Sequence, residues 1–220
     1  MNVVHGQYEE AAYPLARYPV GNIPAEVRDS MLRLLADERM LIRGGLAYIL
    51  LSGDEQYMLK DLDMLSTDDD EQAVICHISD AEVVYVNRNS RGEKVVTAFW
   101  KGESGYFKLD VLMGHAPVAA EACLWNDVRC RSITRSYLVT NRICKIAEKE
   151  RRRHSDAKTL NHYKVAQAVA QDMLARGQRI SSGDRPLFVA KVEDASVVLR
   201  GLIGRDDAER FARTCRSLAD

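Results

Sequence analysis

The sequence predicts an α+β protein, with a mixed sheet and helices in its N-terminal part and a helical bundle in its C-terminal part. Residues 61–66 alternate polar and apolar side chains, as a half-buried strand does, and three further strand-like segments follow before residue 114. Beyond about residue 135, apolar residues recur at the three- and four-residue spacing of helices. A run of strands followed by a run of helices is typical of the α+β class.

Composition excludes several classes of protein. The chain has 220 residues, of which 46% are hydrophobic and 29% charged, and this is ordinary for a globular protein. Its net charge of -1 does not indicate a general nucleic-acid binder. No apolar run approaches the roughly 18 residues of a membrane helix, and the first ten residues lack the apolar core of a signal peptide. Five cysteines without C-x-x-C spacing indicate reduced thiols, so we expect a cytoplasmic protein without a membrane partner.

The N-terminal elements follow in order. Residues 1–22 are rich in tyrosine and proline without helical period, which predicts an irregular arm. Pro24 precedes an amphipathic helix that ends near Asp37, and residues 46–51 form a short apolar helix. The next expected elements are, in order, strand 61–66, helix 70–80, strand 82–87, turn 88–93, strand 94–100, turn 102–105 and strand 106–113.

The chain then changes character. Residues 118–126 are rich in alanine and predict a helix. Helical stripes continue through 139–147 and 163–173, a loop is expected at 181–183, and two further helices are expected at 186–202 and 208–218. We therefore predict two domains, residues 1–125 with the N-terminal arm and residues 126–220.

Charge is distributed unevenly along the chain. Residues 54–82 contain ten acids and one lysine, a net charge of −9, whereas residues 129–153 carry a net charge of +7. Two solvated faces of opposite sign would explain this pattern. A site that holds both divalent cations and a polyphosphate would explain it as well.

Asp61 and Asp63 lie one residue apart in an expected strand, so both carboxylates point to the same face of the sheet. Placing two like charges side by side is unfavourable unless a cation or solvent neutralises them. Mg²⁺ is a suitable partner because it prefers carboxylate and phosphate oxygens. An exposed strand end beside the acids 68–70 remains an alternative explanation.

Three other features support a site of this kind. Gly44 and Gly45 open an apolar helix, and glycines at a helix N-terminus let the backbone approach a phosphate. Asp110 lies among apolar neighbours in another expected strand, and it would join Asp61 and Asp63 if the strands are adjacent. Three convergent carboxylates suit a two-metal phosphoryl-transfer site. The basic helix around Lys145 follows in the second half.

The order of these motifs resembles the nucleotidyltransferase superfamily with the DNA polymerase beta-type fold. The segment LIRGGLAYILLSGDEQYMLKDLDML, followed by SYLVTNRICKIAEKERRR, is most similar to the AbiEii-type toxin nucleotidyltransferases. The resemblance covers about residues 26–175. The chain departs from the pattern in the fifteen residues between Gly45 and Asp61, in residues 57–60 before the D-L-D motif, and in the absence of an acid after Lys158.

The resemblance implies an enzyme that transfers NMP from an NTP donor, such as ATP, GTP or CTP, to an acceptor hydroxyl and releases pyrophosphate. It implies two Mg²⁺ ions, with RNA or tRNA as the acceptor and a cognate antitoxin as a partner. The implied metal-binding and catalytic residues are Asp61, Asp63 and Asp110. The implied nucleotide-binding residues are Gly44, Gly45, Lys60, Lys145 and Lys158.

Other functions stay open at this point. Two alternatives keep the enzymatic activity and change the acceptor. In one the acceptor is a small molecule, as for antibiotic nucleotidyltransferases, and in the other it is a protein hydroxyl. A non-catalytic nucleotide-binding module with the same fold is a third, and a structural protein with coincidental acids is a fourth. For the enzyme, we expect the three aspartates to converge beside Gly44 and Gly45, and the helix that holds Lys145 to face them across a cleft.

Overall fold

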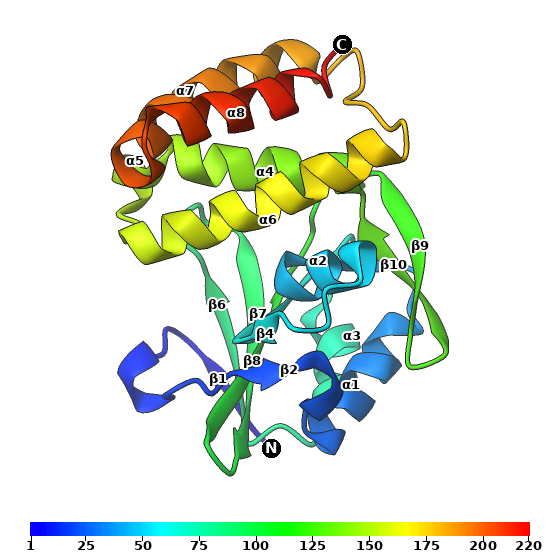
Figure 1. Cartoon of the computed structure of the whole chain (residues 1–220). Helices are drawn as coiled ribbons and strands as arrows, with labels where there is room; N and C mark the ends of the chain where they lie inside the picture. The colour runs from blue at the N-terminus through cyan, green and yellow to red at the C-terminus, as the bar shows by residue number, and fades with distance from the viewer. The chain divides into compact units, whose positions relative to one another are not determined.

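A computed structural model describes the whole chain, Met1–Asp220, which divides into two compact units (Figure 1). Unit 1 comprises Met1–Ile133 and unit 2 comprises Thr134–Asp220. Unit 1 contains all ten strands and unit 2 is entirely helical, which confirms the predicted α+β class. No helix combines the length and the apolar character that crossing a membrane requires.

Unit 1 is built on an eight-stranded mixed sheet in the order β1-β6-β7-β8-β5-β3-β10-β9. Strands β2 and β4 form a separate two-stranded sheet. Figure 1 shows β6, β7 and β8 lying side by side. The elements of unit 1 are β1 (Asn2–His5), β2 (Tyr18–Pro19), α1 (Ala25–Leu35), β3 (Met40–Arg43), α2 (Gly44–Ser52), β4 (Met58–Leu59), β5 (Asp61–Ser66), α3 (Glu71–Ile75), β6 (Val83–Arg88), β7 (Lys94–Gly102), β8 (Gly105–Leu112), β9 (Ala120–Trp125) and β10 (Val128–Ile133).

The sequence predicted most of these elements. The strand at 61–66 and the turns at 88–93 and 102–105 are confirmed. The N-terminal arm is more regular than expected, because β1 pairs in parallel with β6 at the edge of the sheet. Alternation along β5 and β8 buries one set of side chains, including Leu62 and Leu109, and leaves the opposite set, which contains the acids, on the other face.

The predicted helix at 118–126 is wrong, because these residues form β9. Asn126 and Asp127 both have positive φ, at 47° and 63°, and make the two-residue turn of a hairpin with β10. Pairing across this hairpin outweighs the helix propensity of the alanines. The hairpin joins unit 1 through Ser132, which lies opposite Ile42 of β3. The compact units therefore divide at residues 133/134, whereas the sequence placed the boundary at 125/126.

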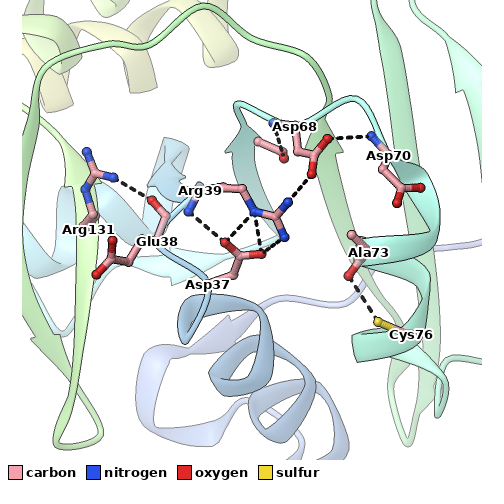
Figure 2. Close-up of polar contacts among 9 residues, drawn as sticks. Asp37, Glu38, Arg39, Asp68, Asp70, Ala73, Cys76 and Arg131 are labelled. Atoms are coloured by element: carbon pink, nitrogen blue, oxygen red, sulfur yellow. Dashed lines mark hydrogen bonds and ion pairs between the residues drawn. The ribbon is translucent and has the colours of Figure 1, made fainter.

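An ion-pair network connects the residues just before β3 with those just beyond β5 (Figure 2). Met40 at the start of β3 pairs with Ser66 at the end of β5. Arg39, just before β3, forms an ion pair with Asp68, just beyond β5, and its Nε donates to Asp37 Oδ1 at 2.9 Å. A one-residue slip would reverse the faces of the side chains, so this network helps to hold the acids of β5 on their face.

Unit 2 consists of five helices. They are α4 (Arg135–Ala147), α5 (Lys149–Arg152), α6 (Asp156–Ala175), α7 (Arg185–Ile203) and α8 (Arg205–Arg216). The predicted helix at 186–202 is confirmed as α7, and α8 begins three residues before the predicted start. Helices α4 and α6 pack against each other, and Thr134 and Ser155 cap their N-termini by accepting backbone N–H groups.

Candidate functional site

Strands β5 and β8 run parallel and bring the predicted aspartates onto one face of the sheet. Asp63 lies directly opposite Asp110, and Asp61 lies directly opposite Lys108. Each strand contributes residues i and i+2, which point to the same side. The convergence of the three carboxylates on one face, expected from the D-L-D and K-L-D spacings, thus matches the register of these strands.

Asp110 is held by two neighbours. Lys108 Nζ lies 2.7 Å from Asp110 Oδ2, and the hydroxyl of Thr97 donates to Asp110 Oδ1 at 2.8 Å. Thr97 is the residue opposite Asp110 on β7. Both oxygens of this carboxylate therefore already have a protein partner.

The cluster carries more negative than positive charge. Burial, followed by the charges of Asp63 and Asp110, raises the pKa of Asp61 to about 6. Burial also raises the pKa of Asp110, with a smaller contribution from Asp63, although Lys108 opposes the shift. Burial alone would lower the pKa of Lys108, but its pairing with Asp110 outweighs this and raises that pKa. The acids thus lie where a cation would be stabilised.

Gly44 begins α2 directly against the Asp63 side chain. Its φ is +69°, and a Cβ at this position would overlap Asp63 Oδ2 and lie 3.0 Å from Asp63 Cβ. Only glycine satisfies both conditions without strain. A Cβ on Gly45 would lie 2.9 Å from Leu59 Cδ2, so tight packing explains this second glycine. The predicted position of Gly44 at the rim of the acidic cluster agrees with this geometry.

The donor chemistry of the cluster suits a hard divalent cation, since it offers carboxylate oxygens on one face. However, no group of three or more His, Cys, Asp or Glu side chains is arranged so that it could hold a metal ion as it stands. Lys108 provides a positive charge within the cluster instead. The residues therefore fit a metal in type, while binding would require the side chains to close around it.

The acidic loop 68–70 is a structural feature separate from this cluster. Asp68 accepts a hydrogen bond from the Asp70 backbone N–H at 3.0 Å. Figure 2 shows this bond beside the ion pair of Asp68 with Arg39. The side chain of Asp70 caps α3 by accepting Gln72 N, and Asp69 lies 3.3 Å from Lys94 Nζ. These acids have their own partners at the opposite end of β5 from Asp61.

The predicted nucleotide-binding lysines lie in both units. Lys60 is exposed just before β5, where its charge acts on Asp61. Lys145 on α4 and Lys158 on α6 belong to unit 2. The positive charges of both lysines help to lower the pKa of the buried His162. The expectation that Lys145 faces the aspartates concerns the placement of one unit against the other, and it stays a prediction.

Sequence reasoning missed three residues at the cluster. Lys108 shares the two-residue spacing of Asp110, so the period of the strand would have placed it on the same face. Thr97 could be found only from the pairing of β7 with β8. Tyr8 comes from the N-terminal arm, and it lies close enough to Lys108 for each group to shift the pKa of the other. No local pattern connects residue 8 to a strand a hundred residues later.

No protein-family model and no curated protein sequence matches the chain. Solved structures do match it. An antigenic nucleotidyltransferase-like protein from Paracoccidioides brasiliensis superposes with a TM-score of 0.57 at 12% identity, covering 92% of this chain and 99% of that one. JHP933 from Helicobacter pylori has a TM-score of 0.44 at 13% identity, covering 91% of this chain and 90% of that one. The first of these two matches shows that the fold of this chain is nucleotidyltransferase-like.

Proposed function

We propose that the protein is a Mg²⁺-dependent nucleotidyltransferase that transfers NMP from an NTP to an acceptor hydroxyl. The observation that carries this proposal is the placement of Asp61, Asp63 and Asp110 on one face of a nucleotidyltransferase-like sheet, with Gly44 against Asp63. A surface acid normally has solvent or a base around it, whereas this cluster has one ion pair, between Lys108 and Asp110, for three carboxylates.

The roles of the residues follow from their positions. Asp61 and Asp63 would hold the cation, and the N-terminus of α2 at Gly44 would direct backbone N–H groups and a positive partial charge at the triphosphate. Mg²⁺ bound there would supply Lewis-acid stabilisation of the charge that develops on the phosphoryl oxygens. The acceptor oxygen forms a bond to the α-phosphorus as the bond to the pyrophosphate group breaks, and the proton of the acceptor hydroxyl passes to solvent.

Unit 2 has the electrostatic character of a phosphate-binding region. Burial, and then Arg142 and Lys145, lower the pKa of His162 to about 2, so the ring is neutral. Arg142 Nη1 lies 3.0 Å from His162 Nδ1, and an arginine can only donate, so the imidazole proton is on Nε2. That buried nitrogen has no hydrogen-bond partner. The charges of Lys145 and Lys158 both act on His162, so positive charge gathers in this part of unit 2, and this supports the two lysines as triphosphate contacts.

Lys145→Met and Lys158→Met should each raise the KM for the NTP about 10-fold or more, because each removes a charged contact to phosphate. Lys164→Met is the matched control, since Lys164 is an exposed lysine on the same helix as Lys158. Steady-state kinetics with varied NTP would measure these effects. An unchanged KM in both variants would remove these lysines from the nucleotide site, and Lys60 would then be tested in their place.

The acceptor is proposed to be RNA, including tRNA, as in an AbiEii-like toxin that has a cognate antitoxin. The purified protein would be incubated with each α-labelled NTP and cell extract, and the labelled material would be digested with nuclease or protease. Label that nuclease alone releases would support RNA. Label in protease-sensitive or small material would instead identify a protein or small-molecule acceptor, and no incorporation from any NTP would contradict transferase activity.

A non-catalytic nucleotide-binding module is the second candidate. The ion pair between Lys108 and Asp110 favours it, because it engages one of the three expected metal ligands. Calorimetry with NTP and Mg²⁺ separates this module from a protein with no nucleotide site, and the labelling experiment separates it from the enzyme.

A further inference from the structure

Four charged side chains form a two-by-two array across β5 and β8. Asp61 lies beside Lys108, and Asp63 lies beside Asp110, in the register of the parallel strands. All four point to the same face. The array therefore contains one buried cation among three acids. Two further cations come from outside it, because the charge of Lys60 acts on Asp61 and Arg43 of β3 lies opposite Asp63 in the register.

The fixed cation is held firmly in place. The side chain of Lys108 is only 11% exposed, and its ammonium group lies 2.7 Å from Asp110 Oδ2. The phenol of Tyr8 in the N-terminal arm lies near it, since each of the two groups shifts the pKa of the other. A lysine with a carboxylate, a phenol and little solvent around it has few alternative positions.

Asp110 has no oxygen left without a protein partner. Thr97 Oγ1 donates to Asp110 Oδ1, and Thr97 is itself 3.5 Å from Asn87 Nδ2, a donor that orients its hydroxyl. A divalent ion on Asp110 Oδ2 would lie about 2.1 Å from the oxygen that the ammonium also contacts. Two cations at such a short distance would repel each other strongly, because little solvent screens them.

We propose that Lys108 takes the place of the second divalent ion, so that the site holds one metal ion, bound by Asp61 and Asp63. Asp110 then serves as the counter-ion that positions Lys108. This inference rests on the proposed function for the presence of a metal ion, and it departs from the two ions that the sequence resemblance implies.

The test counts metal ions. Mn²⁺ would be titrated into the full-length protein with a saturating non-hydrolysable NTP, and free Mn²⁺ would be followed by electron paramagnetic resonance. We expect one bound ion per chain in the wild type and in Lys108→Arg, which keeps the charge. Lys108→Met, which keeps the chain length and removes the charge, should bind two. Lys101→Met, at an exposed position on β7, is the control and should bind one.

The outcomes separate this inference from the proposed function. Two ions bound by the wild type would overturn the role of Lys108 and leave nucleotidyl transfer standing. One ion in both the wild type and a folded Lys108→Met would also overturn it. If Lys108→Met does not fold, the test uses the number of Mn²⁺ ions bound by the wild type and by Lys108→Arg. One ion in each supports the inference, and two ions in either overturn it. No bound Mn²⁺ in the wild type would overturn this inference together with the proposed metal site.

Discussion

Asp61→Asn should reduce NMP transfer by about 100- to 1000-fold and at the same time make the metal-free protein more stable. The loss of activity follows from removing a charged ligand, which is worth about 3–4 kcal/mol in the transition state. The gain in stability follows from the environment of Asp61, where burial and the charges of Asp63 and Asp110 disfavour a carboxylate. Asparagine has a similar shape and no charge.

The direction and the pH range of the stability effect follow from the pKa. Folding raises the pKa of Asp61 from 3.8 to about 6, so the folded state favours the protonated acid. This contribution is complete below about pH 4 and is lost as the pH rises through about 6. Ionised Asp61 therefore costs about 1–3 kcal/mol at neutral pH, a cost that Asn avoids.

Urea unfolding between pH 4 and 7.5 in the presence of a chelator would measure this effect. The free energy of unfolding of the wild type should fall relative to that of Asp61→Asn across this range. Asp29→Asn, an exposed acid on α1, is the control and should change neither stability nor activity. Mg²⁺ with NTP should raise the wild-type Tm more than that of Asp61→Asn. A variant with full transfer activity would end the catalytic assignment.

Gly44→Ala should lower the free energy of unfolding by about 2–4 kcal/mol and transfer by about 100-fold. A φ of +69° costs an alanine about 1–2 kcal/mol. The new Cβ would also collide with the Asp63 carboxylate, and because Asp63 Cβ and Cγ lie 3.0 Å away, rotating the carboxylate alone does not remove the crowding. Displacing a metal-binding or catalytic carboxylate by about 1 Å is enough for a 100-fold loss.

Gly53→Ala is a matched control at the other end of the same helix. Gly53 has a φ of +73° and nothing within 4 Å of where a Cβ would lie, so alanine there meets only the backbone strain. It should cost about 1–2 kcal/mol and leave transfer unchanged. Chemical denaturation and transfer kinetics on both variants would isolate the contribution of Asp63. Equal activity losses in the two would show that Gly44 matters only for its backbone conformation.

The sequence by itself determined the local parts of the site. The two-residue period of a strand places Asp61 with Asp63, and it places Lys108 with Asp110, because successive side chains alternate between faces. The paired glycines before an apolar run predicted the start of α2. The helical second half followed from three- and four-residue spacing, which depends only on the geometry of one helix.

Only the tertiary structure decided which strands are neighbours. The parallel pairing of β5 with β8 joins residues nearly fifty positions apart, and local propensity carries no information about it. The same holds for Thr97 and Tyr8, which reach Asp110 and Lys108 from other elements. Residues 118–126 show the converse: their alanines favour a helix, but a turn and a partner strand beyond them select β9. Pairing between distant segments outweighs local preference, since backbone hydrogen bonds and burial are satisfied only once the partner strand is in place.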